Sequence, residues 1–466
     1  MLYDFLPLNR GSQEPLYLQL YDGIKNAIEN GKLVGGQKLP SIRVLSQDLK
    51  LSRTTIETAY QQLSVEGYIA SKPQSGYFVA QDIKKLQKQP SLSVSYSQPL
   101  ENQGLIRFNL GTDCIDSKHS DIKLWRKHVK DVLGRQEILA SYGDPQGEWE
   151  LRSALSFYSH GARGVSVSPQ DIVIGAGTQS LLYLLCGLIQ ENVQRVAMEK
   201  PGFRQAEQVL RDCGIEPVLL SADRDGVCVP ELEQADVQAL WISPSSRPNG
   251  RTIPMSRRLR LLEWAQKTGS LVIEDDYNGE LRYRARPIPA WQSQDSQRVV
   301  YMGSFSKLLL PSVRIGYMIL PPRLMQRYQR RVHGYNQTAS KVEQLALAGY
   351  IREGQLERQL RRLRKLYAEK STELTEALQK AFGKQMDLIL QETALYLLAT
   401  VKNGMDSQGL VRAALEQGVR VMPSKQETGF WGQVQMGFAG IPTQDIPEAV
   451  NRLQKAWRRE EALDNP

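Results

Sequence analysis

The chain has 466 residues, of which 41% are hydrophobic and 23% charged. These values are typical of a globular protein, and the length predicts two to four domains rather than one. The net charge of +9 favours a polyanionic partner, but residues 1–80 hold eight Lys and Arg against seven Asp and Glu. Bulk charge therefore does not locate the surface for such a partner, and the placement of individual residues has to do so.

Several classes of protein are disfavoured by the same sequence. The longest apolar run, LLYLLCGLI at 181–189, is shorter than the roughly 18 residues that a membrane-spanning helix needs. The N-terminal residues lack the basic and apolar segments of a signal peptide. The four cysteines show no CxxC spacing and the four histidines do not cluster, so we expect free thiols, a cytoplasmic protein and no metal site.

The first predicted helix spans Pro15 to Asn30 and ends at Gly31. Its apolar residues recur at helical spacing and define one buried face. These residues are Leu16, Leu20, Ile24, Ala27 and Ile28.

Two shorter helices follow, each preceded by a serine that can cap it. Ser41 precedes the first, whose apolar face comprises Ile42, Val44, Leu45 and Leu49. Ser52 precedes the second, in which Ile56, Ala59, Tyr60 and Leu63 face inward. This spacing leaves Arg53, Thr54, Glu57 and Thr58 outward near the helix start, a placement that suits the DNA major groove.

A short hairpin is predicted in YIASKPQSGYFVA, residues 68–80. Tyr68–Ser71 and Gly76–Val79 are expected to be strands, and the KPQSG tip between them resembles a wing that brings Lys72 and Ser75 to DNA. From periodicity alone, a small helical bundle for protein contacts remains an alternative.

The run from Pro15 to Ile69 closely resembles the GntR family of winged-helix regulators, through LPSIR, LSRTTIETAYQQL and EGYI. The resemblance implies a DNA-binding domain at residues 11–80 that binds double-stranded operator or promoter DNA. The residues it implies for DNA contact are Arg43, Arg53, Thr54, Thr55, Lys72 and Gly76. Glu57 departs from the family, in which many members carry arginine there, so the base preference at that position stays open between cytosine contact and phosphate repulsion.

Residues 81–106 are rich in Gln, Ser, Lys and Pro and predict a linker. From Arg107 to the end, short apolar runs alternate with helical patterns, which predicts an α/β domain at 107–466 with a mostly parallel sheet flanked by helices. Examples of the predicted strands are 171–177, 195–200, 239–243, 271–276 and 298–303.

A lysine constellation follows the last of these strands, in GSFSKLLLPSVRIGY at 303–317. Lys307 lies where open α/β sheets bind ligands, and Ser304, Ser306 and Arg314 surround it in sequence. An amine beside hydroxyls and a guanidinium suits a phosphorylated aldehyde, with Lys307 forming a Schiff base and the others holding the phosphate.

A second constellation ends the predicted strand LVIEDDYNGELRY, residues 271–283. An acid at this point can pair with a pyridine nitrogen, and we expect Asp275 to do so, with Tyr277 reaching the ring's 3-oxygen. Asp276 is the alternative, as an acid that caps a turn or helix.

Three further elements support the same kind of ligand. In VIGAGTQSLL, the backbone N–H groups of Gly177, Thr178 and Gln179 are expected to hold a phosphate at a helix start. Phe203 in EKPGF can stack on a pyridine ring, although a phenylalanine taken alone is more often a core residue. Tyr142 opens SYGDPQGEWELR.

In this order, these elements resemble fold-type I aminotransferases of class I/II. The resemblance implies pyridoxal 5′-phosphate (PLP) as cofactor and Lys307, Asp275 and Phe203 as its main partners. It also implies that Tyr142 reaches the cofactor phosphate of a neighbouring subunit, and therefore a homodimer with shared sites. A GntR-type head on such a body resembles the MocR subfamily of regulators, in which PLP or its adduct with an amino compound is the signal and heads can be exchanged between subunits.

The body departs from aminotransferases where they bind the substrate carboxylate. The late stretch GQVQMGFAGIP at 432–442 has Gln433 and Gln435 and no arginine, and Tyr396 stands where many relatives have histidine. In the loop SPSSRPNG at 243–250, where aminotransferases usually carry Asn or His before Pro-Thr-Gly, Arg247 or Asn249 could substitute. These differences favour an amine, an atypical ligand or PLP itself as effector. Three hypotheses therefore remain: a ligand-responsive regulator, an active aminotransferase tethered to DNA, and an inert dimerisation scaffold.

A basic stretch, RQLRRLRKLYAEK at 358–370, allows two interpretations. It is either a solvated helix face or a track for DNA phosphates.

Overall fold

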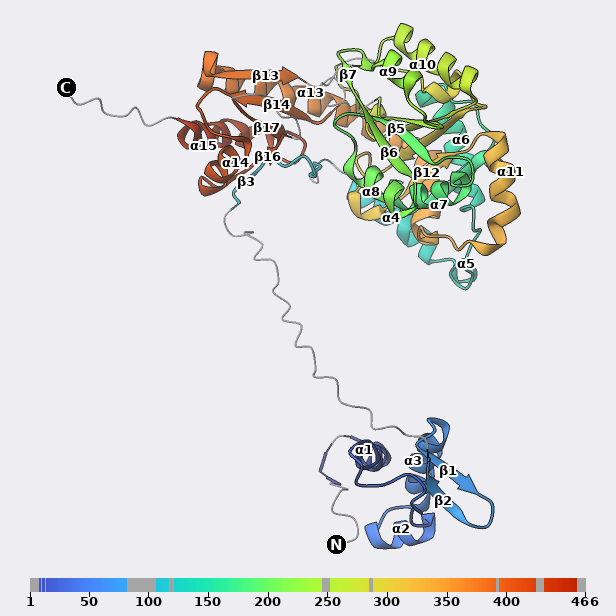
Figure 1. The fold of residues 1–466 in the computed structure, drawn as a ribbon. Coiled ribbons are helices and arrows are strands. Elements are labelled where there is room, and N and C mark those ends of the chain that lie inside the picture. Colours follow the sequence, from blue (N-terminus) through green and yellow to red (C-terminus); the bar gives the residue numbers. More distant parts are fainter. Residues whose placement is uncertain are drawn as a thin grey trace, which may run out of the picture. The chain divides into compact units, whose positions relative to one another are not determined.

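The computed structural model describes residues 8–9, 11–12, 14–81, 106–116, 119, 121–244, 252–284, 288–390, 394–424 and 431–458. The chain forms two compact units, which divide between residues 100 and 101, and each is described by itself (Figure 1). The linker expected at 81–106 lies outside the described residues except at its two ends.

The first unit contains three helices and a hairpin, as the sequence predicts. Its elements in chain order are α1 (Leu16–Glu29), α2 (Ile42–Leu49), α3 (Arg53–Val65), β1 (Ile69–Lys72) and β2 (Gly76–Val79). Both predicted caps form: Ser41 Oγ accepts from Val44 N at 3.3 Å and Ser52 Oγ accepts from Thr55 N at 3.1 Å. Each cap satisfies one backbone donor that the first helical turn leaves without a partner.

The core of this unit joins all three helices to the hairpin. Leu20, Ile24, Ile56 and Leu63 are buried, and the Tyr60 hydroxyl donates to Pro40 O at 2.9 Å, which ties α3 to the turn before α2. One predicted core residue is wrong, because Val44 is exposed on α2 while its neighbour Leu45 is buried. Because this eight-residue helix packs through one narrow apolar stripe, it buries Leu45 and leaves the adjacent Val44 outside the stripe.

The second unit is built on a seven-stranded sheet with the order β4-β12-β11-β10-β9-β5-β6. All of its strands are parallel except β12, which pairs antiparallel with β11 and β4. The strands are β4 (Ile172–Gly175), β5 (Arg195–Glu199), β6 (Glu216–Leu220), β9 (Ala239–Ile242), β10 (Leu271–Asp276), β11 (Val299–Ser304) and β12 (Gly316–Ile319). The expected mostly parallel sheet is therefore present.

Helices cover both faces of this sheet, which explains why its strands are continuously apolar. Alternate residues of one strand enter different cores: Val173 packs with α7 and α8, whereas Ile172 and Ile174 pack with α6 and α12. The helices are α4 (Ile122–Leu133), α5 (Gln136–Leu139), α6 (Trp149–Arg163), α7 (Thr178–Ile189), α8 (Arg204–Asp212), α9 (Val229–Gln234), α10 (Met255–Thr268), α11 (Pro322–Arg331) and α12 (Lys341–Arg352).

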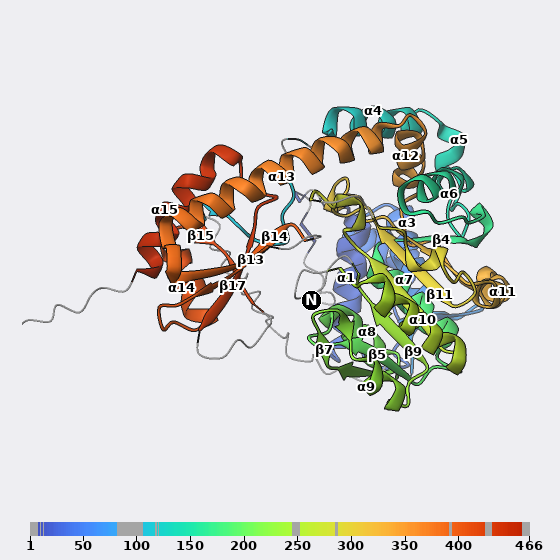
Figure 2. The same cartoon turned by 90° about the horizontal axis from the view of Figure 1, so that it is seen from above.

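A smaller antiparallel sheet lies near one end of the long helix α13 (Gln355–Phe382). This helix extends from the part of the body that contains α12 to the part that contains the smaller sheet (Figure 2). Its order is β13-β14-β17-β16, and α14 (Ser407–Glu416) and α15 (Ile446–Trp457) pack nearby. Its strands are β13 (Met386–Leu390), β14 (Tyr396–Val401), β16 (Met422–Pro423) and β17 (Gly432–Gly437). Two short pairs complete the strands: β3 (Phe108–Asn109) with β15 (Val419–Arg420), and β7 (Ala222–Asp223) with β8 (Gly226–Val227).

Candidate functional site

A cavity of about 450 Å³ opens where β9, β10 and β11 end and faces the smaller sheet. This is the edge of a parallel sheet at which α/β proteins bind ligands. Nine predicted residues line it: Thr178, Gln179, Phe203, Asp275, Tyr277, Ser304, Ser306, Lys307 and Arg314. The structure therefore assembles almost the whole predicted set in one place.

Lys307 follows β11 and is 7% exposed. Its Nζ donates to Thr112 O at 2.9 Å and to Cys114 O at 3.2 Å. Burial lowers the pKa of this amine below its usual value, although Cys114 and Asp113 partly oppose the shift. A lowered pKa increases the fraction of neutral amine, which is the form that attacks an aldehyde.

A cradle for a phosphate lies at the start of α7. Gly177 precedes that helix with φ +87°, and a Cβ built on it would lie 2.9 Å from Nη2 of Arg314. The backbone thus approaches the guanidinium as only glycine allows. Ser304 Oγ donates to Ser306 Oγ at 3.2 Å beside them. A helix N-terminus, a guanidinium and hydroxyls together form a donor set that suits a phosphate dianion.

The two acids at the end of β10 face opposite sides of the sheet, as successive strand residues do. Asp275 lines the cavity, and burial followed by the charge of Asp276 raises its pKa to about 7, while a hydrogen bond from Ser243 opposes the rise. Asp276 is 0% exposed; its carboxylate lies 2.6 Å from Arg163 Nη2 and accepts from the Tyr301 hydroxyl at 2.8 Å. The alternative role considered for Asp276, a turn or helix cap, is not what the structure shows, because the side chain belongs to a buried ion pair.

Phe203 and Tyr277 lie on the cavity walls. Phe203 immediately precedes α8, and Tyr277 immediately follows β10. Burial raises the pKa of the Tyr277 hydroxyl, and the charge of Asp275 raises it further, whereas Arg314 lowers it. Tyr277 therefore remains a neutral donor between an acid and a guanidinium.

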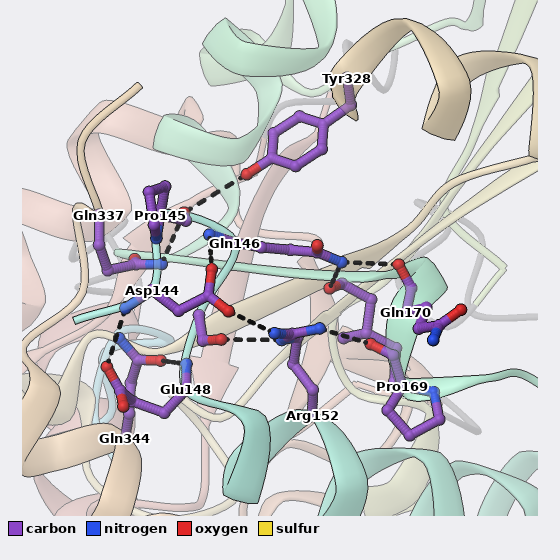
Figure 3. A network of polar contacts seen from close by, with 12 residues as sticks. Asp144, Pro145, Gln146, Glu148, Arg152, Pro169, Gln170, Tyr328, Gln337 and Gln344 are labelled. Carbon is purple, nitrogen blue, oxygen red and sulfur yellow. Dashed lines mark hydrogen bonds and ion pairs between the residues drawn. The ribbon is translucent and has the colours of Figure 1, made fainter. Parts of the chain in front are cut away.

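Tyr142 does not line the cavity of its own chain and is fully exposed. The loop after it is nevertheless held firmly, as Figure 3 shows. Asp144 pairs with Arg152 at 2.6 Å, Glu148 N donates to Gln344 Oε1 at 2.8 Å, and Gln146 Nε2 donates to Gln170 O at 2.7 Å. A fully exposed aromatic residue on an anchored loop is suited to contact with another molecule.

The wall formed by the smaller sheet is uncharged in the part that the structure describes. Gln435 on β17 and Tyr396 on β14 line the cavity, whereas Gln433 bonds Ser424 and Thr400. Ser424 also lines the cavity. Arg247 and Asn249, which could take the place of the Asn or His that aminotransferases usually carry in this loop, lie outside the described residues.

Sequence reasoning missed several lining residues. Ser243 follows β9 and could have been found, because it ends a predicted strand at the same sheet edge. Thr112 and Cys114 carried no local signal, since only the fold brings their carbonyl groups to Lys307. The same holds for Trp241, Gln205, Leu395 and Leu398.

The first unit presents its predicted DNA-contact residues to solvent. Arg43 on α2 and Arg53 and Thr54 on α3 are exposed. Thr55 is half-buried, and its hydroxyl lies 2.7 Å from Ser52 Oγ, so it contributes to the cap as well.

A cation that the sequence analysis did not select, Lys38, lies before α2 and beside the hairpin strand β2. Lys72 is exposed with its Nζ 4.9 Å from the Phe78 ring centre, and Lys38 Nζ lies 5.8 Å from the same ring. Gly76 has φ +99° and a Cβ placed there would lie 3.7 Å from Lys38. Lys72 of the wing and the neighbouring Lys38 therefore place two cations beside the Phe78 ring.

The basic stretch at 358–370 lies on α13 and is not uniformly solvated. Arg361 is exposed, but Arg364 Nε donates to Glu280 O at 2.7 Å and Lys370 is buried against Asp116 at 2.5 Å. Arg362 pairs with Asp121 at 3.0 Å. At least three of its cations therefore hold the body together.

Metal and membrane binding can be addressed for the described residues alone. There, no group of three or more His, Cys, Asp or Glu side chains could hold a metal ion. Within the same ranges, no helix is long and apolar enough to cross a membrane.

Family models match both units. Residues 16–79 match bacterial regulatory proteins of the gntR family, and residues 103–453 match aminotransferase class I and II. The chain is 36% identical over 459 residues to an uncharacterized HTH-type transcriptional regulator, YdeL, of Bacillus subtilis, covering 97% of this chain and 98% of that protein. It is 31% identical over 471 residues to the probable rhizopine catabolism regulatory protein MocR of Rhizobium meliloti, covering 97% and 96%.

Among solved structures, the body resembles LysN, an α-aminoadipate aminotransferase from Thermus thermophilus. The TM-score is 0.67 at 23% identity, and the match covers 75% of this chain and 92% of that one. This similarity shows that the body has the fold-type I aminotransferase fold.

Proposed function

Because this chain belongs to the GntR-family transcription regulators that carry an aminotransferase-like body, the MocR subfamily, we propose that PLP and a small amine at its cavity control its binding to DNA. The observation that carries the proposal is the position of Lys307. Its amine, with a lowered pKa, lies in one cavity with Asp275 and with the Gly177–Arg314 cradle.

The residues present fit the cofactor. The cradle at α7 and Arg314 would hold its phosphate, Asp275 would face the ring nitrogen, and Phe203 would contact the ring. When bound, PLP supplies an aldehyde that reacts with amines and a ring that withdraws electrons. The solved structure of LysN in complex with N-(5'-phosphopyridoxyl)-L-leucine supports this choice of cofactor.

The DNA-binding surface of the proposal is the N-terminal part of α3 with the wing. Arg53 and Thr54 would contact bases in the major groove, while Arg43 and Lys72 would contact phosphates. Thr55 and the wing around Gly76 would complete the contact. The gntR family match over residues 16–79 supports this assignment.

A physical route for the control begins at Lys307 itself. Its amine donates to the carbonyl groups of Thr112 and Cys114, in the described segment 106–116 that follows residues 82–105 in sequence. Asp113 in this segment binds Arg420 through two contacts of 2.9 Å, which connects it to the smaller sheet region. A covalent bond to the Lys307 nitrogen would leave it with fewer N–H groups to donate to this segment, so the segment is positioned to respond to the state of the lysine.

The proposal includes a homodimer with shared sites, with Tyr142 reaching the partner's cofactor phosphate. The full exposure of Tyr142 supports it, as does the exposure of other large apolar side chains on the same part of the chain. These are Ile122, Leu133, Leu139, Trp149 and Phe157. Exchange of heads between the subunits remains one arrangement of this dimer.

An active aminotransferase is the second candidate, because the residues that fit the cofactor favour it. Its prediction is repeated turnover of an amino donor and a keto acceptor. The uncharged wall at Gln435 disfavours it, since an α-carboxylate is best bound by a paired guanidinium.

The test compares DNA affinity for the cofactor-free, PLP-bound and amine-bound protein. We expect the affinity or footprint to differ among these states, and Lys307→Ala to abolish the difference. Arg53→Ala should weaken DNA binding about 10- to 100-fold without changing the cofactor's absorbance band. Identical DNA binding in all three states would contradict the proposed control.

A matched pair of variants tests the route. Asp113→Asn, which weakens the contact with Arg420, should reduce the response of DNA binding to amine while PLP still binds. Glu216→Gln removes the surface pair with Arg195, formed at 2.9 Å, and should leave the response unchanged.

A further inference from the structure

Two polar side chains on the wall formed by the smaller sheet have no hydrogen-bond partner in the described part of the chain. Gln435 and Tyr396 both line the cavity, and among the residues that the structure describes no group hydrogen-bonds either side chain. Gln435 lies directly opposite Leu398 on β14, and Tyr396 is two residues from Leu398, so both side chains lie on one face of the sheet. A half-buried amide and hydroxyl without protein partners are available to a ligand.

Both groups are neutral. Burial raises the pKa of the Tyr396 hydroxyl to about 12, so it stays protonated at neutral pH and can donate. An amide both donates and accepts. Behind them, Gln433 Oε1 accepts from Ser424 Oγ at 2.6 Å and Gln433 Nε2 donates to Thr400 Oγ1 at 3.1 Å, which extends the uncharged polar surface.

The charges of the cavity lie elsewhere. In the described part of its lining, the cations are Lys307 and Arg314, and the acids are Glu199 and Asp275. Arg314 is directed to the cradle at Gly177, and Lys307 is the reacting amine. A carboxylate placed against Tyr396 and Gln435 would therefore be desolvated without a free cation from the described lining, whereas a hydroxyl or amide would find both donors and acceptors there.

We propose that the wall of Tyr396, Ser424 and Gln435 selects a primary amine that carries hydroxyl or amide groups in place of a carboxylate. This inference rests on the proposed function, because the amine end of such a ligand reacts at the Lys307 site. It specifies the class of effector: a small amino alcohol or related neutral polar amine, rather than an α-amino acid.

The test uses two probes that differ in one group. Serinol and L-serine share an amine and a hydroxymethyl group, but serinol carries a second hydroxymethyl group where L-serine carries the carboxylate. Each is titrated into the PLP-bound full chain, and the shift of the cofactor's absorbance band gives its dissociation constant. We expect the wild type to bind serinol at least about tenfold more tightly.

Gln435→Arg should reverse this preference, because a guanidinium at this position can pair with the carboxylate. The ratio of the two dissociation constants should change by about 10- to 100-fold in favour of L-serine. Gln208→Arg makes the same chemical change on the exposed face of α8, outside the cavity lining, and should leave the ratio as in the wild type.

The outcomes separate the two proposals. Tighter binding of L-serine by the wild type, binding of neither probe, or an unchanged ratio in folded Gln435→Arg would overturn the inference and leave the cofactor assignment standing. If Gln435→Arg does not fold, Gln435→Leu takes its place and should weaken serinol binding without strengthening that of L-serine. Absence of any absorbance band that depends on Lys307 would contradict the proposed function itself, and this inference with it.

Discussion

At the end of β10, two adjacent carboxylates have opposite surroundings. Asp275 faces the cavity, and a hydrogen bond from Ser243 only partly offsets the rise in its pKa caused by burial. Asp276 is buried, pairs with Arg163 and accepts a hydrogen bond from Tyr301. In the cofactor-free protein, an ionised carboxylate therefore destabilises the folded state at Asp275 and stabilises it at Asp276. This contrast yields a paired prediction.

In the cofactor-free protein, folding raises the pKa of Asp275 from 3.8 to about 7. A group of this kind contributes stability that is fully present below about pH 4 and is lost as the pH rises through 7. Asp275→Asn should therefore increase the free energy of unfolding at pH 8 by up to about 4 kcal/mol, and by much less at pH 5. It should also weaken PLP binding more than about tenfold, because the ring nitrogen loses its acid.

Asp276→Asn is the matched control. It leaves Arg163 buried without its carboxylate and should lower the free energy of unfolding by about 3–5 kcal/mol. Denaturant unfolding of both variants and the wild type at pH 5 and pH 8 gives the comparison. A loss of stability at pH 8 for Asp275→Asn similar to that for Asp276→Asn would show that Asp275 is a structural acid.

At the scale of elements, Gly177 at the start of α7 allows the backbone to approach Arg314 closely enough to form the phosphate cradle. Gly177→Ala adds a methyl group 2.9 Å from Arg314 Nη2 at a φ of +87°. We expect PLP affinity to fall at least about tenfold and stability to fall by about 1–3 kcal/mol. Cofactor titration and thermal unfolding measure the two effects.

Gly187→Ala, on the same helix, provides the control for this change. A Cβ at Gly187 meets nothing within 4 Å. Alanine there should increase stability by about 1 kcal/mol through helix propensity and leave the affinity unchanged. Equal losses of PLP affinity in the two variants would place the effect in α7 as a whole rather than in the cradle.

The strands and caps were predictable because their signals are local. Continuous apolar runs indicate strands that are buried on both faces. Ser41 and Ser52 indicate helix starts, because each side chain accepts a hydrogen bond from the backbone N–H three residues later. The antiparallel direction of β12 was not predicted, since it depends on the partners β11 and β4.

The residues at the cavity also fall into those that the sequence identifies and those that only the fold brings there. Lys307, Asp275 and Arg314 follow strands or lie in one motif, so sequence identifies them. Thr112, Cys114 and Ser424 reach the cavity only through contacts between distant parts of the chain. The prediction that Val44 is buried was wrong for a related reason. Helical spacing alone does not distinguish a residue at the edge of an apolar face from one at its centre.

At the scale of the whole molecule, the exposed Tyr142 carries a prediction about assembly. If each cavity combines Lys307 of one subunit with Tyr142 of the other, neither Tyr142→Ala nor Lys307→Ala alone forms a complete site. A hybrid dimer of the two variants forms one complete and one doubly altered site. Co-expression with different affinity tags allows the hybrid to be isolated.

The hybrid should bind PLP tightly at about one site per dimer, whereas Tyr142→Ala dimers bind it weakly at both sites and Lys307→Ala dimers form no covalent complex. Tyr183→Ala is the control, because Tyr183 is also an exposed tyrosine but bonds Asp212 outside the cavity lining. As a single variant, it should bind like the wild type. A monomeric protein, or wild-type affinity in Tyr142→Ala dimers, would contradict shared sites. Restoration only in the hybrid has no explanation within one subunit, because each variant chain lacks a residue that only its partner can supply.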